Sequence, residues 1–207
     1  MAQVLPGIEY VDDTSPAHIY VLDDGGEITL IDAGLPNEAP KVLGYLERTG
    51  RKPSQVKRII LTHRHGDHAG AVGELAKATG AEVYAHEDEA TAIAAQEGAP
   101  KEIKRLKDGD VVPVLGGLRA IEVPGHTTGH LCFYLPGKKA LFTGDSLINR
   151  GEMTGPVPQY TSDVARAHQS LKEKIAPLDV EALCVAHGDV LPSGASAPLR
   201  MMIAGLQ

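Results

Sequence analysis

Apolar and polar positions alternate in short runs along this chain, and the runs have the lengths of ordinary strands and helices. Turn clusters such as Asp12-Asp13-Thr14-Ser15-Pro16 and Asp23-Asp24-Gly25-Gly26 separate the first strands. Residues 36–50 are predicted to form a helix, and its two ends are indicated by the sequence, since Asn37 suits an N-cap and Gly50 a C-cap. Up to residue 100 the pattern predicts strands at 4–11, 17–22, 27–31, 56–61 and 81–86, and helices at 36–50, 69–78 and 87–96.

The second half of the chain follows a similar order of strands, helix, strand and helix, with one strand–helix pair fewer. Ser162 is the expected cap of its first helix. Residues 149–160 form a long irregular stretch, which we interpret either as a wall of the substrate pocket or as a surface connection. The elements expected here are strands at 110–115, 118–123, 130–135, 139–142 and 180–186, and helices at 162–175 and 198–204. Two such halves predict two sheets packed face to face with helices outside, a four-layer α/β/β/α sandwich that forms one domain over residues 1–207.

Three histidines and one aspartate are concentrated in one segment, which lies between a buried strand and a helix. The segment is Thr62-His63-Arg64-His65-Gly66-Asp67-His68. Ligands bind beyond the carboxyl ends of the strands in α/β sheets. His63 and His65 are two residues apart, so in an extended segment their side chains point the same way. Asp67 and His68 follow the turn at Gly66 and could face a second ion. The cluster therefore predicts a metal site at this strand end.

Three later residues share that setting, because each lies beside a glycine at the end of an apolar strand: His126, Asp145 and His187. Asp32 also follows a strand. The sequence leaves it either as a turn residue or as an acceptor that orients a metal-binding histidine. The isolated histidines are expected to be structural: His18, His86 and His168.

Composition narrows the class of protein. Hydrophobic residues make up 43% of the chain and aromatic ones only 4%, so aliphatic side chains must form the core. A net charge of −7, with no basic run longer than two residues, argues against a nucleic-acid surface. No apolar run approaches the ~18 residues of a membrane span, and the N-terminus lacks the features of a signal peptide. Cys132 and Cys184 form no C-x-x-C pair. We therefore expect a cytoplasmic protein that acts on a small molecule, and the sequence is compatible with a homodimer.

The order of the motifs resembles the metallo-β-lactamase-fold hydrolase superfamily, over about Ile8 to Gly188. The resemblance rests on Asp32, on Thr-His-x-His-x-Asp-His at 62–68, on Pro-Gly-His-Thr-x-Gly-His at 124–130, on Gly-Asp at 144–145 and on the strand-end His187. That family has the four-layer sandwich predicted above.

The resemblance implies a metal-ligand set. A first zinc ion would be bound by His63, His65 and His126, a second by Asp67, His68 and His187, and both by Asp145. Imidazole and carboxylate donors without thiolate suit Zn²⁺ and also tolerate iron or manganese. His130 matches a family position that is usually not a ligand, and we expect it to be structural or to support a ligand.

This ligand set implies a hydrolytic reaction. Between two divalent cations the pKa of a bridging water falls far enough for hydroxide to exist near neutral pH. We expect this hydroxide to attack an ester-like carbonyl, while one metal stabilises the oxyanion. The thiolate or alkoxide would then leave with help from the second metal or a donor. Asp67 is a candidate proton shuttle. Tyr160 is a candidate hydrogen-bond donor if its loop folds over the site, the alternative being a surface or packing role.

Within the family, the sequence favours hydrolases of thioesters or lactones. Class B1 β-lactamases have a cysteine where Asp145 stands and are exported. Glyoxalase II enzymes share all seven ligands but contact glutathione through a C-terminal extension, and here only 20 residues follow His187. Quorum-quenching lactonases share the ligands too. They usually carry a tyrosine soon after the bridging aspartate, where this chain has Ser146-Leu147-Ile148.

Other classes of protein fit less well. Nucleases of this family need an inserted domain or a basic face. Persulfide dioxygenases, the rival from another reaction class, use one iron and carry a Gly-Arg-Thr-Asp segment that is missing from residues 149–160. A non-catalytic binding module would be expected to have lost ligands. We therefore expect a dinuclear metal-dependent hydrolase, with the substrate, the native metal, the oligomeric state and the proton donor left open.

Overall fold

The computed structural model describes residues 2–14, 16–96 and 98–207, and the chain forms two compact units, Met1–Leu106 and Lys107–Gln207. Ser15 of the first predicted turn and the initial Met1 lie outside the described residues. The boundary falls where the sequence pattern returns to strands. The expectation of one domain over 1–207 stays a prediction, and each unit is described by itself.

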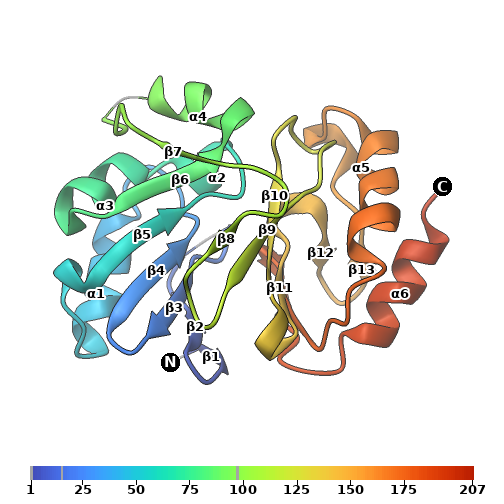
Figure 1. The fold of residues 1–207 in the computed structure, drawn as a ribbon, viewed down its shortest axis with the longest axis horizontal. Helices are drawn as coiled ribbons and strands as arrows, with labels where there is room; N and C mark the ends of the chain where they lie inside the picture. Colours follow the sequence, from blue (N-terminus) through green and yellow to red (C-terminus); the bar gives the residue numbers. More distant parts are fainter. Residues whose placement is uncertain (1, 15, 97) are drawn as a thin grey trace. The chain divides into compact units, whose positions relative to one another are not determined.

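The N-terminal unit is built on a seven-stranded sheet in the order β1-β2-β3-β4-β5-β6-β7 (Figure 1, blue to green). The first four strands pair antiparallel, and β4 to β7 pair parallel. The strands are β1 (Ala2–Leu5), β2 (Ile8–Tyr10), β3 (Tyr20–Asp24), β4 (Glu27–Ile31), β5 (Val56–Ile60), β6 (Glu82–His86) and β7 (Lys104–Leu106). The helices are α1 (Ala39–Arg48), the 3-10 turn Pro53–Gln55, α2 (Gly66–Ala69), α3 (Val72–Thr79) and α4 (Glu87–Ala94).

One face of this sheet packs against α1, α3 and α4. Leu30, Ile59 and Val83 are register partners in neighbouring strands, and all three belong to the same buried core. The helices add Val42, Leu46, Leu75 and Ile93 to that core. This packing places the carboxyl ends of β4, β5 and β6 along one sheet edge, the edge at which ligands bind in parallel α/β sheets.

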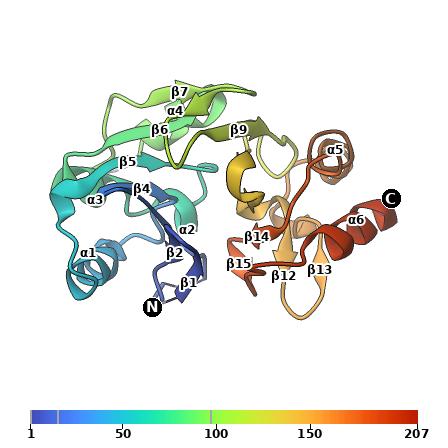
Figure 2. The same ribbon diagram turned by 60° about the horizontal axis from the view of Figure 1, so that its bottom comes forward.

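The C-terminal unit contains a five-stranded sheet, β14-β11-β10-β9-β8, and a small sheet, β13-β12-β15 (Figures 1 and 2). The strands are β8 (Val111–Val112), β9 (Leu118–Glu122), β10 (Leu131–Leu135), β11 (Ala140–Phe142), β12 (Ile148–Asn149), β13 (Met153–Thr154), β14 (Ala182–Cys184) and β15 (His187–Gly188). The helices are α5 (Val164–Ser170), the π-helical segment Leu171–Ile175 and α6 (Ser196–Gly205), with 3-10 turns at Pro136–Lys138, Gly144–Ser146 and Pro158–Tyr160.

A second buried core joins the five-stranded sheet to the helices of this unit. Leu141 and Leu183 pair in register, and both pack in the core that includes Leu171 and Ile203 from the helical segments. Figure 2 shows α6 beside β13. The core therefore supports β11 and β14, the strands that precede two of the predicted metal ligands.

Several predicted boundaries are wrong for local reasons. The strand expected at 4–11 is the hairpin β1–β2, which turns at Gly7 with φ +79°. Asn37 is not a cap. It lies at φ +76°, and α1 follows Glu38. Asp163 rather than Ser162 caps α5, because its side chain accepts the Arg166 N–H.

Other differences concern the length of elements. The strand expected at 110–115 is reduced to β8 and that at 180–186 to β14, and β7 was not predicted. The stretch 149–160 is only partly irregular, since β13 pairs with β12 and a 3-10 turn closes it. In the described part of the chain, no helix combines the length and apolar character needed to cross a bilayer.

Candidate functional site

The N-terminal unit carries the first two predicted donors in the loop after β5. The His63 imidazole is fully buried, and its Nε2 lies 3.0 Å from Nδ1 of His65. Two ligand atoms at about 2.0–2.2 Å from one tetrahedral zinc ion lie about 3.3–3.6 Å apart. The His63 and His65 nitrogens are a few tenths of an ångström closer than that, so a small separation of the two rings would let both bind one ion.

The next two donors lie in the short helix α2. His68 is fully buried, and its Nδ1 is 2.8 Å from Oδ2 of Asp32. Asp32 also accepts the Thr62 backbone N–H at 2.8 Å. Because Nδ1 of His68 donates to this carboxylate, its Nε2 is the nitrogen available to a metal, and it lies 3.7 Å from Oδ2 of Asp67. Asp32 therefore orients His68. It also forms the turn after β4, with φ +65°.

The C-terminal unit carries the other three predicted donors, each of which follows a strand of the five-stranded sheet. Asp145 lies in the 3-10 turn after β11, His126 in the turn after β9, and His187 at β15. Oδ2 of Asp145 is 3.4 Å from Nε2 of His126, and Oδ1 is 3.1 Å from Nε2 of His187. Each carboxylate oxygen thus faces a different imidazole, which is the arrangement a bridging carboxylate needs.

Two residues of this unit hold the donors in place. Nε2 of His130 accepts the backbone N–H of Asp145 at 3.1 Å, as expected for a residue that supports a ligand. Oγ1 of Thr161 lies 3.2 Å from Nδ1 of His126. Fixing the second ring nitrogen of a metal-binding histidine in this way sets its tautomer and orientation. The sequence contained no signal for Thr161, which lies 35 residues from His126.

The catalytic role predicted for Tyr160 stays a prediction. Tyr160 ends the 3-10 turn Pro158–Tyr160, and its side chain is 63% exposed. The segment that follows it is hydrogen-bonded to the turn that carries His126. Ser162 donates its N–H to the His126 carbonyl, and Asp163 donates to the Gly125 carbonyl. The residues just after the predicted loop therefore support the His126 turn.

The isolated histidines have structural contacts. His86 caps α4 by accepting the Asp88 N–H. Nδ1 of His168 lies 2.9 Å from the Gln207 carbonyl oxygen, and His18 packs against the Tyr10 ring at 4.6 Å.

Both thiols are buried in the structure. Burial raises the pKa of Cys132 to about 12 and also raises that of Cys184. Protonated thiols are poor nucleophiles and poor metal ligands. The donor set is therefore imidazole and carboxylate, which suits Zn²⁺ and other divalent ions.

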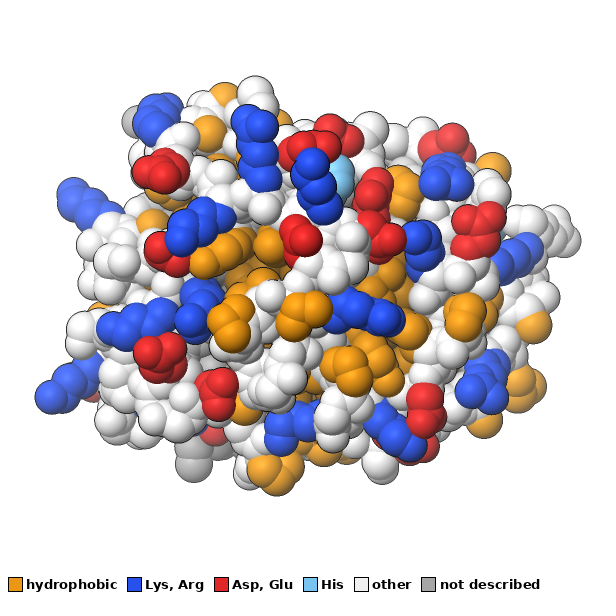
Figure 3. Space-filling model, viewed as in Figure 1, with side chains coloured by type: hydrophobic (Ala, Val, Ile, Leu, Met, Phe, Trp, Pro, Cys, Tyr) orange, Lys and Arg blue, Asp and Glu red, His pale blue; other side chains and the backbone are white. Residues whose placement is uncertain are grey.

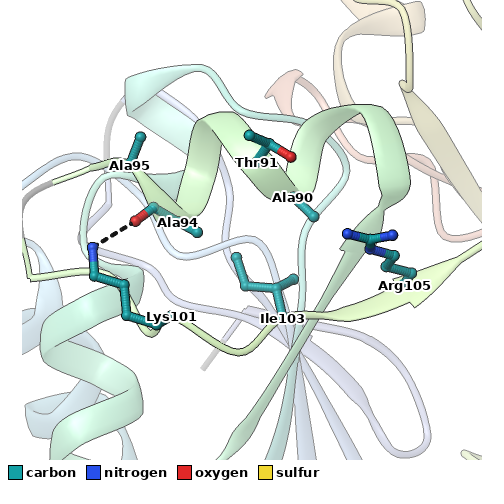
Figure 4. A pocket seen from close by; sticks show the side chains of 7 residues that line it. All are labelled: Ala90, Thr91, Ala94, Ala95, Lys101, Ile103 and Arg105. Atoms are coloured by element: carbon teal, nitrogen blue, oxygen red, sulfur yellow. Dashed lines mark hydrogen bonds between the residues drawn. The ribbon is translucent and has the colours of Figure 1, made fainter.

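The surface carries two further features. On the face shown in Figure 3, basic and acidic side chains are interspersed. A pocket of about 350 Å³ opens between α4 and β7, and the Lys101 Nζ donates to the Ala94 carbonyl at its side (Figure 4). Its lining contains none of the predicted donors: Ala90, Thr91, Ala94, Ala95, Lys101, Ile103 and Arg105.

Comparison with known proteins identifies the class. The sequence profile described as "Metallo-beta-lactamase superfamily" matches residues 12–187. The chain therefore belongs to the metallo-β-lactamase superfamily. It carries His and Asp side chains that could hold a metal ion, as expected of a metallo-hydrolase.

Relatives agree with this class. The chain is 28% identical to the probable metallo-hydrolase YflN of Bacillus subtilis (strain 168), over 83% of this chain and 80% of that protein. It is 43% identical to a hydroxyacylglutathione hydrolase of Cereibacter sphaeroides (strain ATCC 17029 / ATH 2.4.9), over 61% of this chain and 45% of that protein. A hydroxyacylglutathione hydrolase of Rhodopseudomonas palustris (strain BisB18) is 35% identical over 78% of this chain and 58% of that protein. The chain thus spans about half the length of these two hydroxyacylglutathione hydrolases.

A solved structure supports the fold. A metallo-beta-lactamase family protein of Thermus thermophilus is similar with a TM-score of 0.79 and 24% identity, over 99% of this chain and 79% of that one. The fold class predicted from the sequence, the metallo-β-lactamase fold, is confirmed.

Proposed function

We propose that this protein is a dinuclear metal-dependent hydrolase that cleaves an ester-type bond, a thioester or a lactone, in a small molecule. The observation that carries the proposal is Asp145, whose two oxygens each face a different histidine. The similarity to hydroxyacylglutathione hydrolases supports a thioester, because hydroxyacylglutathione is one.

The ions would be two divalent cations, most simply Zn²⁺. His63, His65 and His126 would hold one, Asp67, His68 and His187 the other, and Asp145 both. Bound there, divalent ions supply a nucleophilic hydroxide near neutral pH and polarise the substrate carbonyl. This assignment of donors rests on the resemblance to the family, and every one of them lies within residues 12–187, which the family profile matches.

The chain's own residues prepare the donors. Asp32 fixes His68 with Nε2 available, and Thr161 holds His126. Asp67 has a side chain 24% exposed, so one of its oxygens can accept a proton from solvent or substrate. Tyr160 would donate a hydrogen bond to the leaving group if its loop folds over the site.

The test is metal analysis of protein purified without chelator, beside a hydrolysis panel. The panel contains a glutathione thioester, an acyl-homoserine lactone, a phosphate diester and a cephalosporin. About two zinc ions, or mixed zinc and iron, per chain with turnover of the thioester or lactone supports the proposal. One iron per chain with no hydrolysis and with oxygen uptake on a persulfide would replace it with a dioxygenase.

Variants connect the activity to the donors. His65→Ala and Asp145→Ala should abolish turnover while the protein stays folded, since each removes a metal ligand. His168→Ala is the matched control, because it removes an imidazole whose Nδ1 contacts the Gln207 carbonyl rather than a predicted donor, and it should retain full activity. Full activity in both ligand variants contradicts the mechanism.

A further inference from the structure

The segment that carries the ligands His63 and His65 leaves the sheet before it reaches them. The last sheet hydrogen bond of this segment is from the Leu61 N–H to the Tyr84 carbonyl, at 2.9 Å. Buried backbone groups need partners. Beyond Leu61, side chains supply partners for this loop, beginning with Asp32 on the Thr62 N–H.

Arg64, the residue between the two ligands, is held on both of its backbone polar groups. Its N–H donates to Oε2 of Glu89 at 3.0 Å. Its carbonyl accepts from Nε2 of Gln96 at 3.1 Å. Both partners belong to the same helical segment, because Glu89 lies in the first turn of α4 and Gln96 lies just after its end.

The Glu89 carboxylate is also tied to the Arg64 side chain. Both Glu89 oxygens lie near Nη1 of Arg64, at 2.9 and 3.0 Å. Glu89 is fully buried, whereas the Arg64 side chain is 33% exposed. A buried carboxylate with these charge-assisted bonds has a defined orientation, and such bonds are stronger than neutral ones.

The helix that carries these groups is itself fixed. His86 ends β6 and caps α4 through the Asp88 N–H, and Ile93 of α4 packs in the core of the N-terminal unit. Because β6 pairs with β5 in parallel, α4 stands in a set position beside the end of β5. Movement of Arg64 relative to the sheet would break its bonds to Glu89 and Gln96.

We propose that Glu89 and Gln96 are positioning residues that set the separation of the His63 and His65 ligand atoms by holding the Arg64 backbone. The proposal rests on the proposed function in so far as it takes these histidines as metal ligands. In this role Glu89 and Gln96 act through the Arg64 backbone, to which both are hydrogen-bonded. Partners that hydrogen-bond to a metal ligand typically contribute about 10- to 100-fold to metal affinity, and we expect residues that hold the backbone between two ligands to contribute on the same scale.

The test measures metal binding directly, with Co²⁺ and Zn²⁺ as probes of the metal-free full chain. Glu89→Gln keeps the shape but lacks the charge and one acceptor, and Gln96→Ala removes one hydrogen bond. Both should weaken Zn²⁺ binding in chelator competition, by about 10- to 100-fold for Glu89→Gln and less for Gln96→Ala. Both should also alter the visible absorption of the Co²⁺ form, because the ligand geometry changes.

Asp88→Asn is the matched control. Asp88 lies in the same first turn of α4, but its side chain is 55% exposed and its carboxylate faces His86, 3.9 Å from Nδ1. This variant should therefore bind both ions as the wild type does. Unfolding of the metal-free proteins is measured in parallel, so that a loss of stability alone is recognised.

The outcomes separate the two proposals. If the wild type binds neither ion, the proposed function fails. If the wild type binds, and Glu89→Gln and Gln96→Ala both retain its affinity and Co²⁺ spectrum, the positioning role is overturned. Reduced stability of the metal-free variants with unchanged metal binding overturns it as well, since that result assigns these residues to the fold alone.

Discussion

Asp32 has two structural roles, one through its backbone and one through its carboxylate. Its backbone lies at φ +65°, a conformation that asparagine and aspartate tolerate better than other side chains with a Cβ. Its carboxylate accepts from His68 and Thr62, both of which are buried. The two interpretations of Asp32 that the sequence left open, turn residue and histidine acceptor, therefore both apply.

The substitution Asp32→Asn separates these roles. Asparagine tolerates the backbone conformation, but it lacks the charge that favours the Nδ1–H form of His68. We expect a folded protein with about 10- to 100-fold lower metal affinity or activity. Zinc content after dialysis and the rate of hydrolysis measure this. Wild-type values for both would show that Asp32 is only a turn residue.

Glu9 forms a second network within the N-terminal unit, away from the metal ligands. Arg51 donates to both Glu9 oxygens, at 2.8 and 2.9 Å, and the Tyr45 hydroxyl donates as well. The Arg51 guanidinium is the main reason that the pKa of Glu9 lies below its usual 4.5 in the folded protein. Burial raises the pKa of Tyr45, with a further contribution from Glu9, so that hydroxyl remains a donor.

This network predicts a pH-dependent contribution to stability. Because the folded-state pKa of Glu9 is lowered, its contribution is complete above about pH 4.5 and is lost as the pH falls through the folded value. Glu9→Gln should cost about 1–3 kcal/mol of unfolding free energy at pH 7 and much less in acid. Urea unfolding of both proteins at several pH values measures the difference.

Glu27→Gln is the control for that measurement. The Glu27 side chain is 58% exposed and 3.5 Å from Arg58, so it should change stability by less than about 1 kcal/mol. A constant difference between wild type and Glu9→Gln from pH 7 to pH 3 would contradict the assignment.

The His126 turn and helix α5 depend on one another. Gly125 lies at φ +136°, and a Cβ there would overlap the backbone of Ala167 in α5. Asp163 caps α5 and donates its backbone N–H to the Gly125 carbonyl. The turn that presents His126 is therefore packed directly on a helix.

Gly125→Ala should disrupt this contact. Forcing an extra methyl into a close-packed site costs about 1–3 kcal/mol, and the backbone strain adds to it. We expect lower stability in urea and weaker metal binding, because the turn must move. Gly137→Ala is the control, since nothing lies within 4 Å of its added Cβ and its φ is not positive. Equal stability of the two variants would show that the overlap is relieved without cost.

At the scale of the whole molecule, the predicted donors are divided between the units, four in the N-terminal and three in the C-terminal. The chain carries a net charge of −7, and two divalent ions would offset four of these charges. A ligand that binds only the folded state stabilises it in proportion to the logarithm of its concentration over Kd.

Metal removal should therefore lower the melting temperature. With an ion at about 1,000 times its Kd the stabilisation is about 4 kcal/mol, which corresponds to roughly 10 °C for a chain of this size. Thermal unfolding with and without EDTA measures it. His65→Ala should show a smaller response to EDTA, and an identical melting temperature with and without chelator in the wild type would contradict metal binding.

The elements were predicted where hydrophobic periodicity was strong. Strands β4, β5 and β6 and helix α4 lie where the pattern placed them, within one or two residues. Boundaries at caps were less predictable, because Asn37 and Asp163 have side chains that suit either a cap or a turn, and only the surrounding packing chooses between them.

What the sequence determined by itself is local. Side-chain type and spacing along the chain identified the strands, the motif at 62–68 and the family, since hydrophobic periodicity and covalent spacing are properties of adjacent residues. Only the tertiary structure decided which residues serve those motifs. Asp32 contacts His68, which lies 36 residues away in the sequence. Thr161 and His126 are 35 residues apart, and Glu89 and Arg64 are 25 residues apart. Such pairs form because packed strands and helices bring distant residues together, and no local pattern encodes that meeting.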